Sequence, residues 1–182
     1  LFRSPLAELH LNNSYSNGNA DALAVDGVSY TFPVGDSMTV IVGDNTDGSA
    51  LFTTACAYGG PSNTLDDCGN VNAGITNGGA MAGAAYDFGN GITAAIGYAG
   101  PETGIMTDES LDAYGANVAY TADNYGVSVT YGNVESTAIV AAGEVDTFIA
   151  LNGYYTFENG LSISAGYELG DLGGATPATD ES

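Results

Sequence analysis

Basic side chains are almost missing from this sequence. Its 182 residues include 22 acidic residues, but Arg3 is the one lysine or arginine, so the formal net charge is −21 at pH 7. Nucleic-acid binding requires lysine and arginine to neutralise phosphates, and docking on anionic lipid headgroups requires the same residues. The sequence therefore argues against both, and any charged partner is expected to be a cation.

Charge of either sign is scarce, and long apolar runs are absent. Charged residues make up 13% of the chain, about half the usual share of a soluble domain, whereas hydrophobic residues make up 45%, too many for a disordered tail. No run approaches about 18 apolar residues, so no transmembrane helix is predicted. The chain starts without a methionine or signal peptide and ends in a polar tract at 173–182. We expect it to be a piece of a longer, exported protein.

Helical periodicity is hard to find, and alternation of apolar with small or polar residues dominates instead. Glycine or asparagine interrupts the alternating runs about every 8–12 residues, as in all-β chains. The pattern predicts strands at 5–13, 22–32, 37–43, 80–88, 91–99, 111–121, 126–134, 146–157 and 161–170.

A hairpin unit recurs along the chain. Segments that begin at Tyr30, Tyr86, Tyr120 and Tyr155 each contain a strand ending on an aromatic residue, a short turn with glycine, and a second alternating strand. A solenoid or propeller could also give repeats of this length, but a propeller blade needs four strands and the unit has two. The repeat therefore indicates a series of antiparallel hairpins.

Short and long connections alternate between these strands. The short ones are at 33–36, 89–90, 122–125 and 158–160, and the long, polar ones are at 14–21, 44–79, 100–110 and 135–145. All short turns would then lie at one end of a sheet and all long loops at the other, an asymmetry typical of outer-membrane barrels.

The two faces of the predicted strands differ in residue size. In 91–99, Ile92, Ile96 and Tyr98 fall on one face, whereas Thr93 and Gly97 fall on the other. A face of small and polar residues would make a thin core for a soluble sandwich but suits a water-filled lumen. The sequence predicts an all-β fold, an antiparallel transmembrane barrel of the porin type with about 8–10 strands in this segment. A soluble or fibrous β-domain is the alternative.

Aromatic residues recur near strand ends, where interfacial girdles lie in such barrels. The predicted girdle comprises Tyr30, Phe32, Tyr86, Phe88, Tyr98, Tyr114, Tyr120, Tyr131, Tyr155, Phe157 and Tyr167.

Two cysteines, Cys56 and Cys68, lie in the long connection at 44–79. In an exported protein this pair predicts a disulfide that stiffens a loop at the pore mouth or folded into it, worth on the order of 3 kcal/mol in the chain-entropy model. A pair of unrelated thiols is the alternative. No metal site is expected, because a zinc site would need more ligands than these two and His10, the single histidine.

Acidic residues cluster at the predicted loop end, where they would raise the local cation concentration. The candidates there are Asp44, Asp47, Asp66, Asp67, Glu102, Asp108, Glu109, Glu135 and Glu144. Within strands, Glu8 and Glu168 are predicted to face the lumen, whereas Asp26 shares parity with apolar residues. The stretch 44–49 loosely resembles a calcium loop, although a solvated turn is the simpler interpretation. We expect no cofactor, and loose divalent-cation binding by these loops remains a hypothesis.

Three stretches resemble the outer-membrane porins of cyanobacteria, in which an S-layer-homology domain precedes a barrel related to the carbohydrate-selective porins. They are VDGVSYTFPVGDSMTVIVGDNTDGSALFTTACAYGGPSNTLDDCGN at 25–70, AGAAYDFGNGITAAIGYAG at 82–100 and LDAYGANVAYTADNYGVSVTY at 111–131. The resemblance implies a barrel that assembles as a homotrimer and passes small solutes, chiefly inorganic ions. It implies that residues 1–182 are one barrel segment, and that the remaining strands and an N-terminal domain contacting cell-wall polymer lie outside it. General porins often set acidic residues against clustered arginines, whereas this segment offers Arg3 alone.

The sequence thus favours a passive diffusion channel of the outer membrane with cation preference. A structural or adhesive surface β-protein with acidic loops is the alternative. An enzyme is not predicted, because His10 has no visible nucleophile or acid–base partner.

Overall fold

Eight of the predicted strands are present in the computed structural model, which describes residues 27–56, 75, 79–106, 111–135 and 145–171. The one predicted at 5–13 lies outside these residues. The strand predicted at 22–32 ends later than expected, because β1 continues through Pro33 to Val34. The strands are β1 (Val28–Val34), β2 (Met38–Asp44), β3 (Ala80–Gly89), β4 (Ile92–Gly100), β5 (Ala113–Thr121), β6 (Tyr125–Glu135), β7 (Val145–Thr156) and β8 (Ser162–Asp171).

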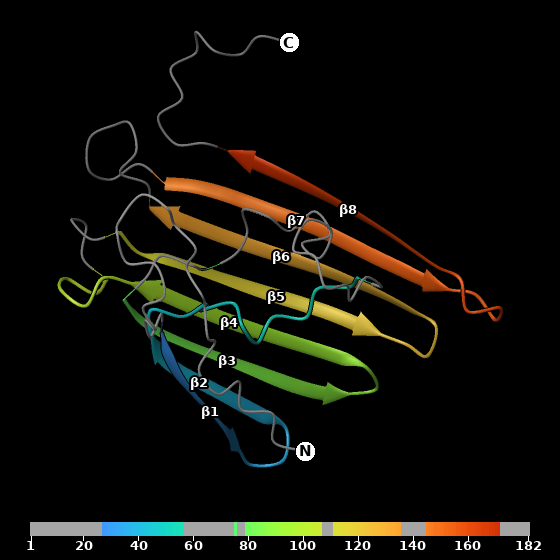
Figure 1. The fold of residues 1–182 in the computed structure, drawn as a ribbon, viewed down its shortest axis with the longest axis horizontal. Coiled ribbons are helices and arrows are strands. Elements are labelled where there is room, and N and C mark those ends of the chain that lie inside the picture. Colours follow the sequence, from blue (N-terminus) through green and yellow to red (C-terminus); the bar gives the residue numbers. More distant parts are fainter. Residues whose placement is uncertain (1–26, 57–74, 76–78, 107–110, 136–144, 172–182) are drawn as a thin grey trace, which may run out of the picture.

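All eight strands form a single antiparallel sheet in sequence order (Figure 1). Its edges are β1 and β8, so the described sheet is open. Pro33 in β1 is compatible with this arrangement, because an edge strand tolerates a residue without a backbone N–H. The all-β, antiparallel part of the prediction is confirmed.

No helix among the residues described is long and apolar enough to span a membrane.

Short and long connections alternate as predicted. Residues 35–37, 90–91, 122–124 and 157–161 connect strands at what we call the turn end, and the three longer connections lie at the opposite, loop end. In the β3–β4 turn, Asn90 and Gly91 have φ values of 55° and 81°. Such a pair of positive φ values belongs to the type I′ turn, whose twist matches that of the two flanking strands.

Successive hairpins are staggered along the sheet. Met38, beside the first turn, pairs with Tyr86, which pairs with Ala94 before the second turn is reached. Ile92, beside that second turn, pairs in the same way with Tyr120, before the third turn. Each hairpin therefore extends beyond the preceding one, and Figure 1 shows the turns stepping across the sheet from β1–β2 to β7–β8.

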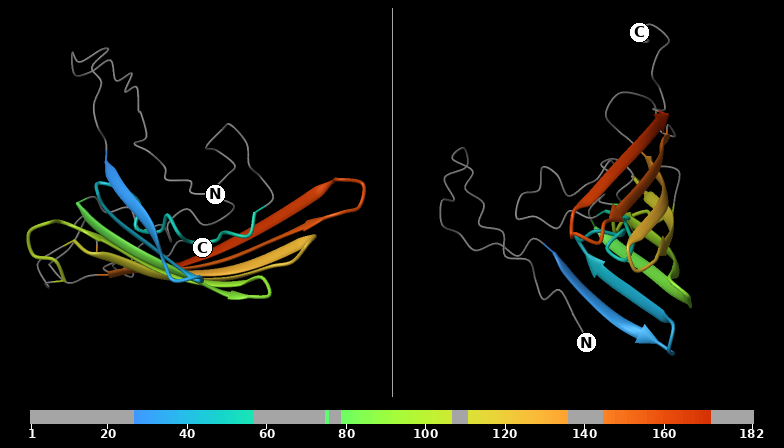
Figure 2. Two further views of the ribbon diagram at one scale, coloured as in Figure 1. Left: turned by 90° about the horizontal axis from the view of Figure 1, so that it is seen from below. Right: turned by 90° about the vertical axis from the view of Figure 1, so that its right-hand side faces the viewer.

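The sheet is strongly curved, and residues 45–56 lie within its concavity (Figure 2). We call the concave side the inner face and the convex side the outer face. The largest apolar side chains lie on the outer face; Tyr30 is 65% exposed, and Ile96 and Tyr167 are each 63% exposed. One register row of this face consists of Phe32, Val40, Ala84, Ile96, Ala116, Tyr131, Ile149 and Leu169.

Small and polar residues form the inner face. Ala119, Ser128, Thr130 and Ala150 are at most 2% exposed. The main apolar cluster is correspondingly small, and it lies on the inner face near the loop end. It consists of the buried residues Ile41, Ile75, Met81, Ala99 and Ala113 with Leu51, Phe52 and Val134 packed against them.

Candidate functional site

A row of glycines crosses the inner face of β3 to β6. Gly83 pairs with Gly97, Gly97 with Gly115, and Gly115 with Gly132. Since none of these residues has a side chain, the row is a strip of bare backbone that crosses the four strands. The small face seen in the sequence therefore leaves room for another part of the chain.

Residues 45–56, which we call the inner segment, pass over the β3 and β4 part of this row at Gly48. A Cβ atom on Gly97 would overlap the backbone carbonyl of Gly48, and one on Gly83 would lie 3.1 Å from the same oxygen. Gly48 itself is buried, and its N–H donates to the carbonyl of Ile75 at 2.8 Å. The close approach of Gly48 thus excludes a side chain at Gly97 and leaves little room for one at Gly83.

Two side chains of the sheet bind the backbone of the inner segment. The N–H of Thr53 donates to Oδ1 of Asn117 in β5 at 2.9 Å, and the N–H of Ala55 donates to Oγ of Ser128 in β6 at 2.9 Å. Asn117 and Ser128 are 2% and 1% exposed. Buried polar groups of this kind are costly unless they are paired, and here they pair with backbone groups that would otherwise lose water.

Hydrogen bonds also order the beginning of the inner segment. The N–H of Asn45 donates to the carbonyl of Gly79 at 2.8 Å, and Oδ1 of Asn45 accepts from the N–H of Gly79 at 3.0 Å. Asp47 accepts from the N–H and hydroxyl of Ser49 at 2.7 and 2.5 Å. The Asp47 carboxylate therefore orders a local turn, in agreement with the simpler interpretation of 44–49.

Each hairpin carries an aromatic pair close to its turn. Ring centroids are 5.6 Å apart in Tyr30–Phe32, 4.8 Å in Tyr86–Phe88, 5.8 Å in Tyr120–Tyr125 and 4.9 Å in Tyr155–Phe157. Seven of these eight residues belong to the predicted girdle, and Tyr125 was missed because its strand was expected to begin one residue later. The turn end thus has a continuous set of aromatic residues.

At the loop end, Tyr98 and Tyr114 are register partners on the outer face. The hydroxyl of Tyr98 donates to Oδ1 of Asp112 at 2.5 Å, and Asp112 is only 5% exposed. The N–H of Glu135 donates to the backbone carbonyl of Asp112 at 2.9 Å, and the N–H of Asp112 donates to Oε2 of Glu135 at 3.3 Å. Asp112 was not predicted, because an aspartate beside a loop gives no sequence signal of burial.

The other predicted girdle residues, Tyr131 and Tyr167, lie closer to mid-strand than to either end. Both point from the outer face, as their parity predicts.

The described acidic candidates lie at the loop end and on the inner face. Asp44 ends β2 at the loop end, and Glu102 is exposed in the connection between β4 and β5. Glu168 is half-buried on the inner face, paired in register with Ala150. Within the described ranges, no group of three or more His, Cys, Asp or Glu residues is arranged to hold a metal ion. The candidates outside the described residues are Glu8, Asp26, Asp66, Asp67, Asp108, Glu109 and Glu144.

Cys56 ends the described part of the inner segment and is disulfide-bonded. Cys68 lies outside the described residues, so the pairing of these two cysteines stays a prediction.

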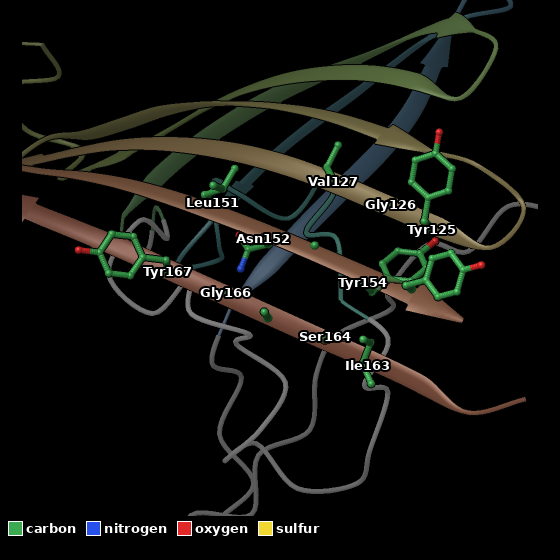
Figure 3. A pocket seen from close by; sticks show the side chains of 13 residues that line it. Tyr125, Gly126, Val127, Leu151, Asn152, Tyr154, Ile163, Ser164, Gly166 and Tyr167 are labelled. Atoms are coloured by element: carbon green, nitrogen blue, oxygen red, sulfur yellow. The ribbon is translucent and has the colours of Figure 1, made fainter. Parts of the chain in front are cut away.

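Two of the hollows on the apolar side of the sheet have volumes of about 510 and 670 Å³. The first is formed by β6, β7 and β8, with Tyr125, Val127, Leu151, Ile163 and Tyr167 around it (Figure 3). The second lies over the alanines of β3 and β5. No charged side chain lines either hollow.

Comparisons with protein-family models, curated proteins and solved structures gave no match. The functional interpretation therefore rests on the geometry above.

Proposed function

We propose that this chain forms part of the wall of a transmembrane β-barrel in an outer membrane, and that the barrel is a passive diffusion channel for small solutes. The proposal rests mainly on the contrast between an outer face of exposed large apolar residues and an inner face of mostly small and polar ones. Exposing the large apolar side chains of the outer face to water is unfavourable, whereas contact with lipid acyl chains is favourable.

The dimensions of the strands support this proposal. Strands β3 to β8 contain 9–12 residues. A tilted transmembrane strand needs about 9–11 residues, and barrel closure requires a stagger between successive strands. The staggered hairpins provide that stagger, and the aromatic pairs lie where a membrane interface would cross their turn ends. Closure requires further strands to join β1 to β8.

The inner segment supports channel function. It runs through the concavity from the loop end of β2 to β6 and would narrow the lumen on that side. Permeant ions are proposed to be cations, because lysine, arginine and histidine are all absent from the described ranges, while Glu168 lies on the inner face. Assembly as a homotrimer, as in the porins that the sequence resembles, is part of this proposal.

The test has two steps, both with the full-length protein. Heat-sensitive migration on a gel and a β-type far-UV circular dichroism spectrum are expected only in detergent or lipid. Reversal potentials across a planar bilayer in a potassium chloride gradient are then expected to show cation preference. Anion preference, or the absence of conductance in protein that has folded in lipid, would contradict the proposed channel.

The alternative function, a structural or adhesive surface β-protein with acidic loops, makes the opposite prediction for the first step. Such a protein must bury its apolar outer face against protein, so it would fold in buffer without detergent.

A further inference from the structure

We propose that Asn117 and Ser128 are positioning residues for the inner segment. They determine where residues 53–55 cross the inner face and thereby set the width of the channel at that level. The link to channel width rests on the proposed function, whereas the positioning itself can be measured without any conductance.

The first argument is the match between acceptors and donors. Thr53 and Ala55 are two residues apart, so in extended backbone their N–H groups point to the same side. Asn117 and Ser128 lie on adjacent strands and accept from these two groups at 2.9 Å each. The wall therefore presents two acceptors at the spacing that an extended chain offers.

The second argument is that the Asn117 side chain is itself held in one orientation. Its Nδ2 donates to Oγ1 of Thr130 at 2.8 Å, and Thr130 is fully buried. This bond leaves Oδ1 directed at Thr53. A flipped amide would place two donors, Nδ2 and the N–H of Thr53, against each other, so the orientation follows from the hydrogen-bond network.

The third argument is that recognition uses backbone atoms. The two bonds do not depend on which side chains the inner segment carries, and the glycine row accommodates its backbone at Gly48. By contrast, the side-chain bond from Thr93 to Thr53 is long at 3.4 Å. The sheet thus holds residues 53–55 through their backbone, while Leu51 and Phe52 of the same segment pack against the apolar cluster of the inner face.

Amide hydrogen exchange of the full-length protein in detergent micelles tests the positioning. In Ser128→Ala, we expect exchange at the N–H of Ala55 to be about tenfold faster, since one hydrogen bond is lost. In Asn117→Ala, the same change is expected at Thr53. Ser128→Thr keeps the hydroxyl and should retain protection at Ala55. Ser29→Ala, which removes a hydroxyl from β1, is the matched control and should leave both amides unchanged.

Single-channel recording of the same variants tests the effect on width. Stronger current noise and a larger conductance are expected in Ser128→Ala and Asn117→Ala but not in Ser29→Ala. Unchanged exchange at Ala55 and Thr53 in folded variants would overturn the proposal, as would unprotected amides in the wild type. If Ser128→Ala does not fold, Asn117→Ala decides in its place. Protected amides in a protein that conducts no ions would contradict the proposed function while supporting the positioning.

Discussion

On the outer face of the sheet the large apolar side chains are the exposed ones, whereas on the inner face most residues shielded from solvent are small or polar, with Ile41, Met81 and Phe148 as larger exceptions. Tyr30 and Ile96 are 65% and 63% exposed, while Asn117 and Ser128 are at most 2% exposed. A soluble domain shows the reverse distribution, and a monomer in water rarely exposes a continuous apolar patch larger than a few hundred Å².

This contrast shows what stabilises each face. The outer face gains little from contacts within the chain, so its stability must come from the surroundings. The inner face gains from hydrogen bonds and close backbone packing with the inner segment. The two faces should therefore respond to substitution by different rules.

The largest effect is expected from a charge on the outer face. Leu151 is 54% exposed near the middle of β7. If that position contacts lipid, Leu151→Arg should destabilise the protein by about 2–4 kcal/mol in urea unfolding from lipid vesicles. Glu102→Arg introduces the same residue in a loop-end connection and should change stability by less than about 0.5 kcal/mol. Equal, small effects of both substitutions would show that the outer face does not meet lipid.

An intermediate effect is expected from adding a methyl group to the inner face. Gly97→Ala places a Cβ against the carbonyl of Gly48, so the inner segment must shift, at a cost of about 1–3 kcal/mol. Gly153→Ala, on the outer face of β7, is the control for a methyl group added to a strand glycine without close packing, because its Cβ would have no contact closer than 3.5 Å. Urea unfolding of the two variants in micelles measures the difference, and a Gly97→Ala protein as stable as Gly153→Ala would refute the close packing.

Much of the sheet could be predicted from the sequence, because period-two alternation and turn residues are local signals. The register rows follow only in part from the short turns, since a bulge between Asp87 and Gly89 shifts the β3–β4 pairing by one residue from the pairing that the Asn90–Gly91 turn would set. The inner segment could not be predicted, because its partners are distant in sequence. Asn117 lies 64 residues from Thr53, and Ser128 lies 73 residues from Ala55.

The small inner face was visible in the sequence, but its cause was not. Gly83, Gly97, Gly115 and Gly132 are separated by unequal intervals, so their alignment appears only when the strands are paired. Once the strands are paired, a run of glycines across four strands marks the place of a docked segment, but the bulge between Asp87 and Gly89 hides this alignment from the sequence.

The smallest effect concerns two tyrosines that the sequence treats alike. Tyr98 and Tyr114 are register partners in the predicted girdle, but only Tyr98 donates to the buried Asp112. Tyr98→Phe leaves that carboxylate with one partner fewer and should cost about 1 kcal/mol, whereas Tyr114→Phe should change stability by less than about 0.5 kcal/mol. Urea unfolding in micelles compares the two variants. Equal losses of stability in the two variants would contradict this prediction. They would mean that the hydrogen bond from Tyr98 to Asp112 adds no stability beyond what the Tyr114 hydroxyl gains from its surroundings.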